Sequence, residues 1–261
     1  MGNISDFPLV ILALSFVGLW LSAQIGGSFQ KKLLPLQEDE WKDLDTVLAA
    51  TLTLLGLIIA FSFSAAVDRC NQRKRCEAEE ANAIGTEYLR IDLLPVADAT
   101  KTRELLRNYL DQRVLFYETG RSMFYETGNE RQLRQIDADT ARLETELWSA
   151  VRAAAGAQPT PTIALAVVGM NDVLNAKGYT QAAWWNRVPR AAWSLMIAVA
   201  IFCNLLLGYD ARRKHILQFM VLPLVLSVAF LLIADIDSPR GGLIHVLPQN
   251  LVGLSQSLHS R

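Results

Sequence analysis

Four long apolar segments set the main limit on how this chain can fold. They are residues 8–25, 46–67, 191–209 and 215–234, and none of them contains Lys, Arg, Asp or Glu. A helix needs about 20 mainly apolar residues to cross roughly 30 Å of hydrocarbon. Aromatic side chains near the segment ends, such as Trp41 and Tyr209, suit the headgroup layer of a membrane. The sequence therefore predicts four membrane-spanning helices.

The first apolar segment lies where a cleaved signal peptide would lie. Its leader MGNISDF carries Asp6 and no Lys or Arg, whereas a signal peptide begins with basic residues. Its apolar run also exceeds the usual length of about 7 to 15 residues. We therefore expect residues 8–25 to remain in the mature protein as a membrane span.

Most of the charge lies between the second and third apolar segments. The chain is 51% hydrophobic but carries 25 basic and 26 acidic residues. Apolar residues recur at helical spacing in this charged region, and no stretch alternates as a strand would. We therefore expect an all-α membrane protein. Its predicted parts are helices 1 and 2 in 1–67, a helical cytoplasmic region in 68–190, helices 3 and 4 in 191–236, and a cytoplasmic tail in 237–261.

The side of the membrane is predicted from the Lys and Arg residues near the span ends. Four crossings put both termini and the helical region on one side, with eight such residues against six on the other. Basic residues favour the cytoplasm, so we expect this side to be cytoplasmic. The dense basic turn at 210–215 falls on the opposite side, and protease or labelling access to that turn tests the topology.

Common catalytic, metal and nucleic-acid signals are missing from the sequence. The three Cys residues form no CxxC pair, the three His residues are scattered, and no Walker loop, GxSxG or HExxH motif occurs. A net charge of −1 gives no basic footprint for nucleic acid. We expect no enzymatic activity, no cofactor, no metal and no nucleic-acid partner.

The second apolar segment has an ordered polar and apolar stripe. At about 100° per residue, its Thr46, Thr53, Leu57, Phe61, Ser64 and Asp68 fall within an arc of roughly 80°. Hydroxyls can line a wetted path, bulky apolar side chains can close it, and carboxylates can select ions by sign. The alternative is that the small residues Thr53, Gly56, Ala60 and Ser64 permit close helix contact. The periodicity leaves both interpretations open.

Two motifs resemble a known family. The stretches EEANAIGTEYLRIDLLP at 79–95 and DSPRGGLIHV at 237–246 are similar to the bestrophin-like domain family of bacterial membrane proteins. The resemblance implies a bestrophin-like homo-oligomeric ion channel in the bacterial inner membrane, with lipid, inorganic ions and further copies of itself as partners. It also implies five subunits around an axial pore that the second span lines.

The resemblance assigns a neck to this pore. Bestrophins narrow through apolar residues one turn apart, a spacing that Leu57 and Phe61 match, whereas Ala65 is too small to complete a third ring. The acidic cluster that binds calcium in animal bestrophins is not matched by DIDSPRGG, so calcium control is not expected. The resemblance suggests anions as the permeant species, although bacterial relatives can pass cations.

The acids of the two motifs admit two roles. Asp235 and Asp237 point about 200° apart on a helix, so they are not expected to hold one ion together. Either acid can pair with Arg69, Arg90 or Arg240 where the membrane and soluble layers meet. In the other role, one of them forms negative rings with Asp68, Glu80 or Glu87 and draws in cations. Asn82 can brace the helix or face an inner vestibule.

The sequence also allows a function other than ion conduction. The pentapeptide FYETG occurs at 116–120 and again at 124–128. These aromatics could form a binding surface for a cytoplasmic partner, in which case the protein would be a non-conducting membrane scaffold or sensor. Rings of subunits that never pass current would favour this hypothesis.

Overall fold

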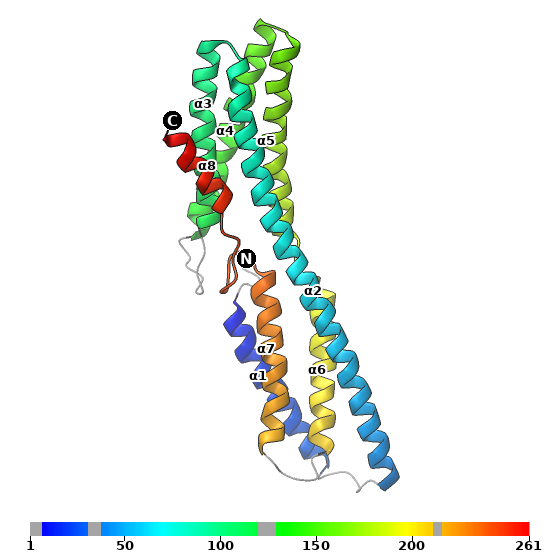
Figure 1. The fold of residues 1–261 in the computed structure, drawn as a ribbon. Coiled ribbons are helices and arrows are strands. Elements are labelled where there is room, and N and C mark those ends of the chain that lie inside the picture. Colours follow the sequence, from blue (N-terminus) through cyan, green and yellow to red (C-terminus); the bar gives the residue numbers. More distant parts are fainter. Residues whose placement is uncertain (1–6, 31–37, 120–128, 211–215, 261) are drawn as a thin grey trace. The chain divides into compact units, whose positions relative to one another are not determined.

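The computed structural model describes residues 7–30, 38–119, 129–210 and 216–260, and the regular structure in these ranges is entirely helical (Figure 1). The helices are α1 (Pro8–Gln30), α2 (Glu38–Arg90), the 3-10 turn η2 (Ile91–Leu93), α3 (Val96–Glu118), α4 (Asn129–Ala157), α5 (Pro161–Trp185), α6 (Arg190–Asp210), α7 (Ile216–Asp237) and α8 (Gln249–His259). The predicted all-α class is confirmed. The second FYETG copy and most of the basic turn at 210–215 lie outside the described residues.

The chain divides into two compact units. The membrane unit comprises residues 1–68 and 187–244, and the bundle unit comprises residues 69–186 and 245–261. The membrane unit holds α1, α6, α7 and the first half of α2. The bundle unit holds the second half of α2 together with η2, α3, α4, α5 and α8.

Four helical stretches in the described part are long and apolar enough to cross a membrane. They are Pro8–Phe29, Trp41–Leu93, Pro161–Tyr209 and Phe219–Asp237. At 53 residues, α2 would be about 80 Å long, whereas the hydrocarbon layer is roughly 30 Å thick. Only its uncharged part, residues 46–67, can therefore lie in lipid, and the charged part from Asp68 onward extends beyond it.

Small residues allow α1 and α6 to pack closely in the membrane unit. A Cβ atom added at Gly26 would strike the carbonyl oxygen of Leu205, and one added at Gly208 would strike the carbonyl oxygen of Ala23. Close backbone approach through small residues is the usual way in which membrane helices gain van der Waals contact. Any side chain at Gly26 or Gly208 would push these two helices apart.

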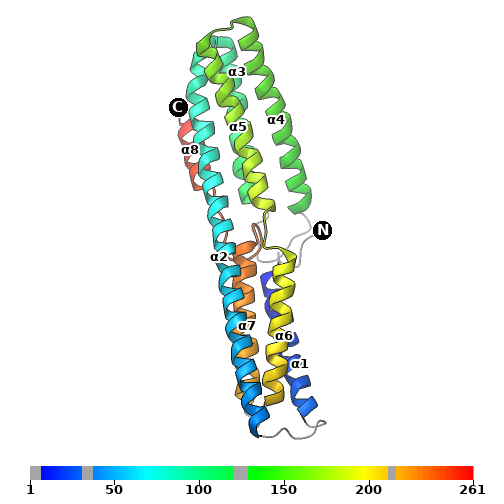
Figure 2. The ribbon, with the colours of Figure 1, turned by 90° about the vertical axis from the view of Figure 1, so that its right-hand side faces the viewer.

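In the bundle unit, α3, α4 and α5 run beside the second half of α2 (Figures 1 and 2). Their buried apolar residues recur every three or four positions, as in Leu106 and Leu110 of α3 and Leu147 and Val151 of α4. The helix α5 begins with a cap, because the Thr160 hydroxyl accepts a hydrogen bond from the Ile163 amide at 3.2 Å. These helices agree with the apolar periodicity of the sequence.

The helix α8 lies in the segment that the sequence indicated only as a tail. A carboxylate from α2 holds its amino terminus: Glu77 Oε1 accepts from the Asn250 amide at 2.9 Å and the Leu251 amide at 3.0 Å. The Asn250 side-chain amide donates to Glu77 Oε2 at 2.6 Å. A carboxylate here satisfies free amides of the first turn and complements the positive end of the helix dipole.

Candidate functional site

The exposed surface of α2 covers most of the helix in the membrane-spanning part, Leu54 and Phe63 included. It carries the five residues that the sequence put forward as pore-lining, Thr53, Leu57, Phe61, Ser64 and Asp68, each exposed in the single subunit. Phe61 is 67% exposed and Leu57 is 52% exposed. The other side of the helix packs inside the membrane unit through Leu55 and Ala66. The stripe is therefore free to meet lipid, water or another subunit.

The same exposure bears on the alternative role of the small residues in this span. Thr53, Gly56, Ala60 and Ser64 are all exposed, and a Cβ atom added at Gly56 would meet nothing within 4 Å. The Thr53 hydroxyl donates to the Ala49 carbonyl at 2.9 Å within its own helix. These residues do not serve as a helix contact inside one subunit, so any such contact would involve a neighbouring copy.

The carboxylate of Asp235 builds the turn that follows α7. Its two oxygens accept hydrogen bonds from the amides of Leu243 at 2.6 Å and Ile244 at 3.1 Å. Gly242 has a φ of +93°, and a Cβ atom there would strike Asp235 Oδ1, so only glycine fits this position. The partners of Asp235 are therefore two backbone amides, whereas the sequence suggested an arginine.

Asp237 anchors a different segment, the one that enters α6. Both of its oxygens accept from the Val188 amide, at 3.0 and 3.1 Å. The Asp237 side chain is buried, and Arg240 lies half-buried in the same turn. Asp235 and Asp237 thus hold separate segments of the chain. Of the other two arginines that the sequence suggested, Arg90 lies 3.9 Å from Asp172, and Arg69 donates to Asn186 Oδ1 at 3.5 Å.

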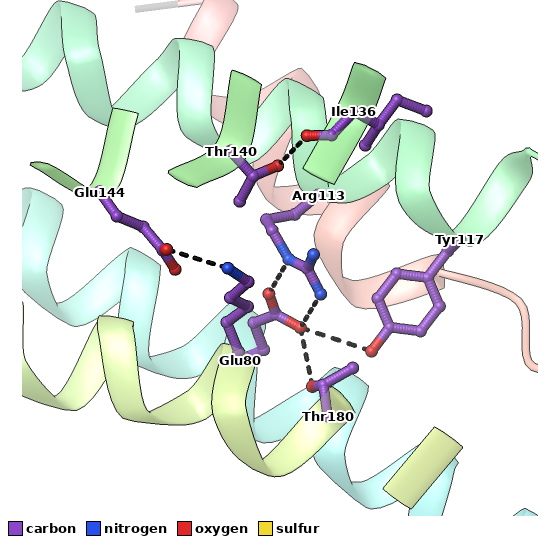
Figure 3. A network of polar contacts seen from close by, with 8 residues as sticks. Glu80, Arg113, Tyr117, Ile136, Thr140, Glu144 and Thr180 are labelled. Atoms are coloured by element: carbon purple, nitrogen blue, oxygen red, sulfur yellow. Dashed lines mark hydrogen bonds and ion pairs between the residues drawn. The ribbon is translucent and has the colours of Figure 1, made fainter. Parts of the chain in front are cut away.

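Glu80 forms the centre of a buried polar network in the bundle unit (Figure 3). It is 0% exposed and pairs with Arg113 of α3, which is 1% exposed. Tyr117 donates its hydroxyl to Glu80 Oε2 at 3.4 Å, and Thr180 of α5 donates to the same oxygen at 3.0 Å. One carboxylate thus joins α2, α3 and α5.

The electrostatics favour the charged form of Arg113. Burial would lower the pKa of Arg113, but the adjacent Glu80 carboxylate raises it above its ordinary value. Burial, followed by the Glu80 charge, raises the pKa of Tyr117, so its hydroxyl remains a donor. A carboxylate satisfied in this way is at odds with the hypothesis that Glu80 contributes to a negative ring, because its charge is already balanced inside the subunit.

The remaining vestibule residues differ from each other in exposure. Asn82 is exposed on α2 and is therefore not bracing the helix through a buried contact, whereas Glu87 on the same helix is fully buried against α5. Among the acids suggested for negative rings, Asp68 is exposed and Glu80, Glu87, Asp235 and Asp237 are buried. In the part of the chain that the structure describes, no group of three or more His, Cys, Asp or Glu side chains could hold a metal ion.

Several buried polar residues of the bundle unit were not predicted from the sequence. Arg73 donates to the carbonyl oxygens of Ala183 and Asn186, each at 3.3 Å, while Glu77 holds α8 and Arg113 holds Glu80. One signal could have revealed them. Five buried residues of α2 follow one another at intervals of three or four positions: Arg73, Glu77, Glu80, Ile84 and Glu87. This spacing places them on one face of the helix, and four of the five are charged residue types.

Comparison with known proteins gives a consistent result. A family model described as a Bestrophin-like domain matches residues 10–251. A bacterial bestrophin homolog from Klebsiella pneumoniae is similar in structure, with a TM-score of 0.60 and 16% identity over 97% of this chain and 97% of that chain. A single-substitution variant of that homolog has a TM-score of 0.57 and 15% identity, covering 100% of this chain and 97% of that chain. No curated protein matches the chain.

Proposed function

The chain belongs to the bestrophin-like domain family, and from this premise we propose that it is a homo-oligomeric ion channel whose axial pore is lined by α2. The observation that carries the proposal is the exposed stripe from Thr53 to Asp68. In a lone subunit this stripe would place the Ser64 hydroxyl against lipid and the Asp68 carboxylate at its edge, where exposed polar groups are costly. Several copies around one axis would place the same groups in water.

The order of side chains along the stripe fits a gated pore. Thr53 and Ser64 supply hydroxyls on either side of Leu57 and Phe61, which lie one turn apart and are the bulky apolar members. A ring of apolar side chains closes a narrow pore by excluding water. We assign the neck to Leu57 and Phe61 and the charged mouth to Asp68.

Two measurements on the purified protein test this proposal. Particle images in detergent should show closed rings, five-fold by family resemblance, with α2 nearest the axis. Protein reconstituted into vesicles should then pass ions along an imposed gradient. A lone subunit, or a ring with α2 packed behind other helices, would overturn the proposal. Rings that pass no current under any gradient would favour the scaffold or sensor instead.

The scaffold hypothesis placed a binding surface on the helical region and suggested the FYETG aromatics as part of it. In the first copy, Phe116 and Tyr117 are buried, with ring centroids 5.0 and 5.5 Å from Trp184. Aromatics packed in this way are not available to a partner, so the first copy cannot act as predicted. The first FYETG copy therefore does not support the scaffold hypothesis.

We place the protein in the bacterial inner membrane with both termini and the bundle unit in the cytoplasm. The eight Lys and Arg residues at the span ends on that side, against six on the other, support this orientation. Labelling of a cysteine introduced into the turn at 210–215 in intact cells tests it. Labelling by a membrane-impermeant reagent applied from outside is the expected result.

Asp68 should influence the sign of the permeant ion. It is the exposed carboxylate at the end of the stripe, and a ring of such carboxylates attracts cations and repels anions. In reconstituted protein under a salt gradient, Asp68→Asn should move the reversal potential toward the anion equilibrium potential. The control is Asp45→Asn, an exposed carboxylate near the other end of the span and about 140° around the helix from Asp68. Equal potentials in wild type and Asp68→Asn would remove Asp68 from selectivity.

A further inference from the structure

Glu87 is an unusual buried acid in the bundle unit. It lies near the end of α2, outside the membrane-spanning part, and is 0% exposed. Neither of its carboxyl oxygens has a hydrogen-bond partner among the described residues. Burying an ionised carboxylate without partners is far more costly than burying a neutral acid. Its neighbours on α2 and α5 therefore determine which form is stable.

The neighbouring helix leaves room for this side chain at a glycine. A Cβ atom added at Gly169 of α5 would strike Glu87 Oε2, and it would lie 2.6 Å from Arg90 Nη1. The side chains of Glu87 and Arg90 thus both lie against the bare backbone of Gly169. A larger residue at this position would displace the ends of these two side chains.

Two charged groups face Glu87, one from each helix. Arg90 follows it by three residues on α2, and Asp172 lies on α5 with an oxygen 3.9 Å from Arg90 Nη1. Both partners are partly exposed, with Arg90 at 33% and Asp172 at 57%, so the edge of the site is open to solvent. Arg90 is therefore shared between a buried acid and an exposed one.

The electrostatics place the titration of this acid near neutral pH. Burial raises the pKa of Glu87 to about 8, Arg90 acts to lower it, and Asp172 acts to raise it. At pH 7 the neutral acid is the main form. Loss of its proton leaves a buried negative charge beside Arg90.

We propose that Glu87 is a proton-binding site that selects the partner of Arg90. With the proton bound, Glu87 is neutral and Arg90 stays with Asp172 across the α2 and α5 contact. When the proton leaves to solvent, the Glu87 carboxylate attracts Arg90 and weakens its contact with Asp172. Proton occupancy therefore changes how α2, the helix that carries the stripe, is held by α5.

Infrared spectroscopy of the full-length protein in detergent tests the site without any measurement of conduction. The carbonyl stretch of a protonated carboxylic acid should be present at pH 7, disappear with a midpoint near pH 8, and be absent in Glu87→Gln. Asp172→Asn should shift the midpoint to lower pH, because Asp172 raises the pKa and competes for Arg90. Glu79→Gln, an exposed acid on the same helix, is the control and should change nothing.

Thermal unfolding gives a second, independent measurement. Because the pKa of Glu87 is higher in the folded protein than its ordinary value of 4.5, the bound proton stabilises the fold. This stabilisation is complete below pH 4.5 and is lost as the pH rises through about 8. The melting temperature of Glu87→Gln relative to wild type should therefore increase across this range. A pH-independent difference, or a protonated band that titrates near 4.5 or survives in Glu87→Gln, would overturn the proposal.

Discussion

Replacing Phe61 with Ala should raise the ion leak through the reconstituted protein by on the order of tenfold, equivalent to a barrier lowered by about 1.4 kcal/mol. Phe61 is the most exposed large apolar residue of α2 within the membrane span, at 67%. If copies of α2 surround an axis, its ring narrows the pore and excludes water. Alanine removes the ring and leaves space for a continuous water column. Ion flux from vesicles, normalised to the amount of protein, measures the change.

Phe63 provides a matched control for this experiment. It has the same side chain on the same helix and is 40% exposed, but two residues along a helix turn it about 200° away from Phe61. Phe63→Ala removes a similar apolar area and should leave the leak at the wild-type level. An equal increase in both variants would mean general loosening of the membrane unit. No increase in Phe61→Ala would remove Phe61 from the neck.

The membrane spans could be predicted because lipid imposes a simple rule on the chain. A span must be apolar over about 20 residues and must satisfy its backbone internally, which only a helix does in this composition. The structure accordingly places α1, α2, α6 and α7 over the four apolar segments. The helical character of the region after Asp68 was also predicted, because apolar residues keep helical spacing after the charges begin.

The partners of the buried charges could not be predicted, because they come from distant parts of the chain. Glu80 and Arg113 are 33 residues apart, and Glu77 and Asn250 are 173 residues apart. A single helix projection shows that Glu80 shares a face with Glu77, but it does not show which residue meets that face. Glu80 therefore looked like a free vestibule acid. The helix α8 was missed because 11 residues give too little periodicity to stand out.

The exposed side of α2 could be predicted from the sequence only in part. Sequence spacing placed Thr53, Leu57 and Phe61 on one side of α2, and the structure shows that this side is exposed in one subunit. A lone subunit would turn this side toward lipid, whereas copies around one axis would turn it toward water. The Phe61 and Phe63 pair is therefore the direct test, since it compares two sides of the same helix.

Removal of Arg113 should have the largest effect on stability. Arg113→Ala would leave Glu80 ionised and buried without its counter-charge, and breaking a buried pair in this way typically costs about 3–5 kcal/mol. Tyr117 and Thr180 would still donate to Glu80 but cannot neutralise it. Unfolding of the purified protein in detergent, followed by circular dichroism, should show a marked fall in the melting temperature or no folded protein at all.

Two further variants separate the lost charge balance from other effects. Arg142→Ala removes an arginine whose side chain is 67% exposed and which pairs with Asp139 on the surface of α4, so its effect should be small. Replacing both members of the buried pair, with Glu80→Leu and Arg113→Met, removes the unbalanced charge and should recover much of the stability lost in Arg113→Ala. If the double variant were as unstable as the single one, packing and the lost Tyr117 and Thr180 hydrogen bonds would account for the effect. If Arg113→Ala were no less stable than Arg142→Ala, the network around Glu80 would not be holding α2, α3 and α5 together.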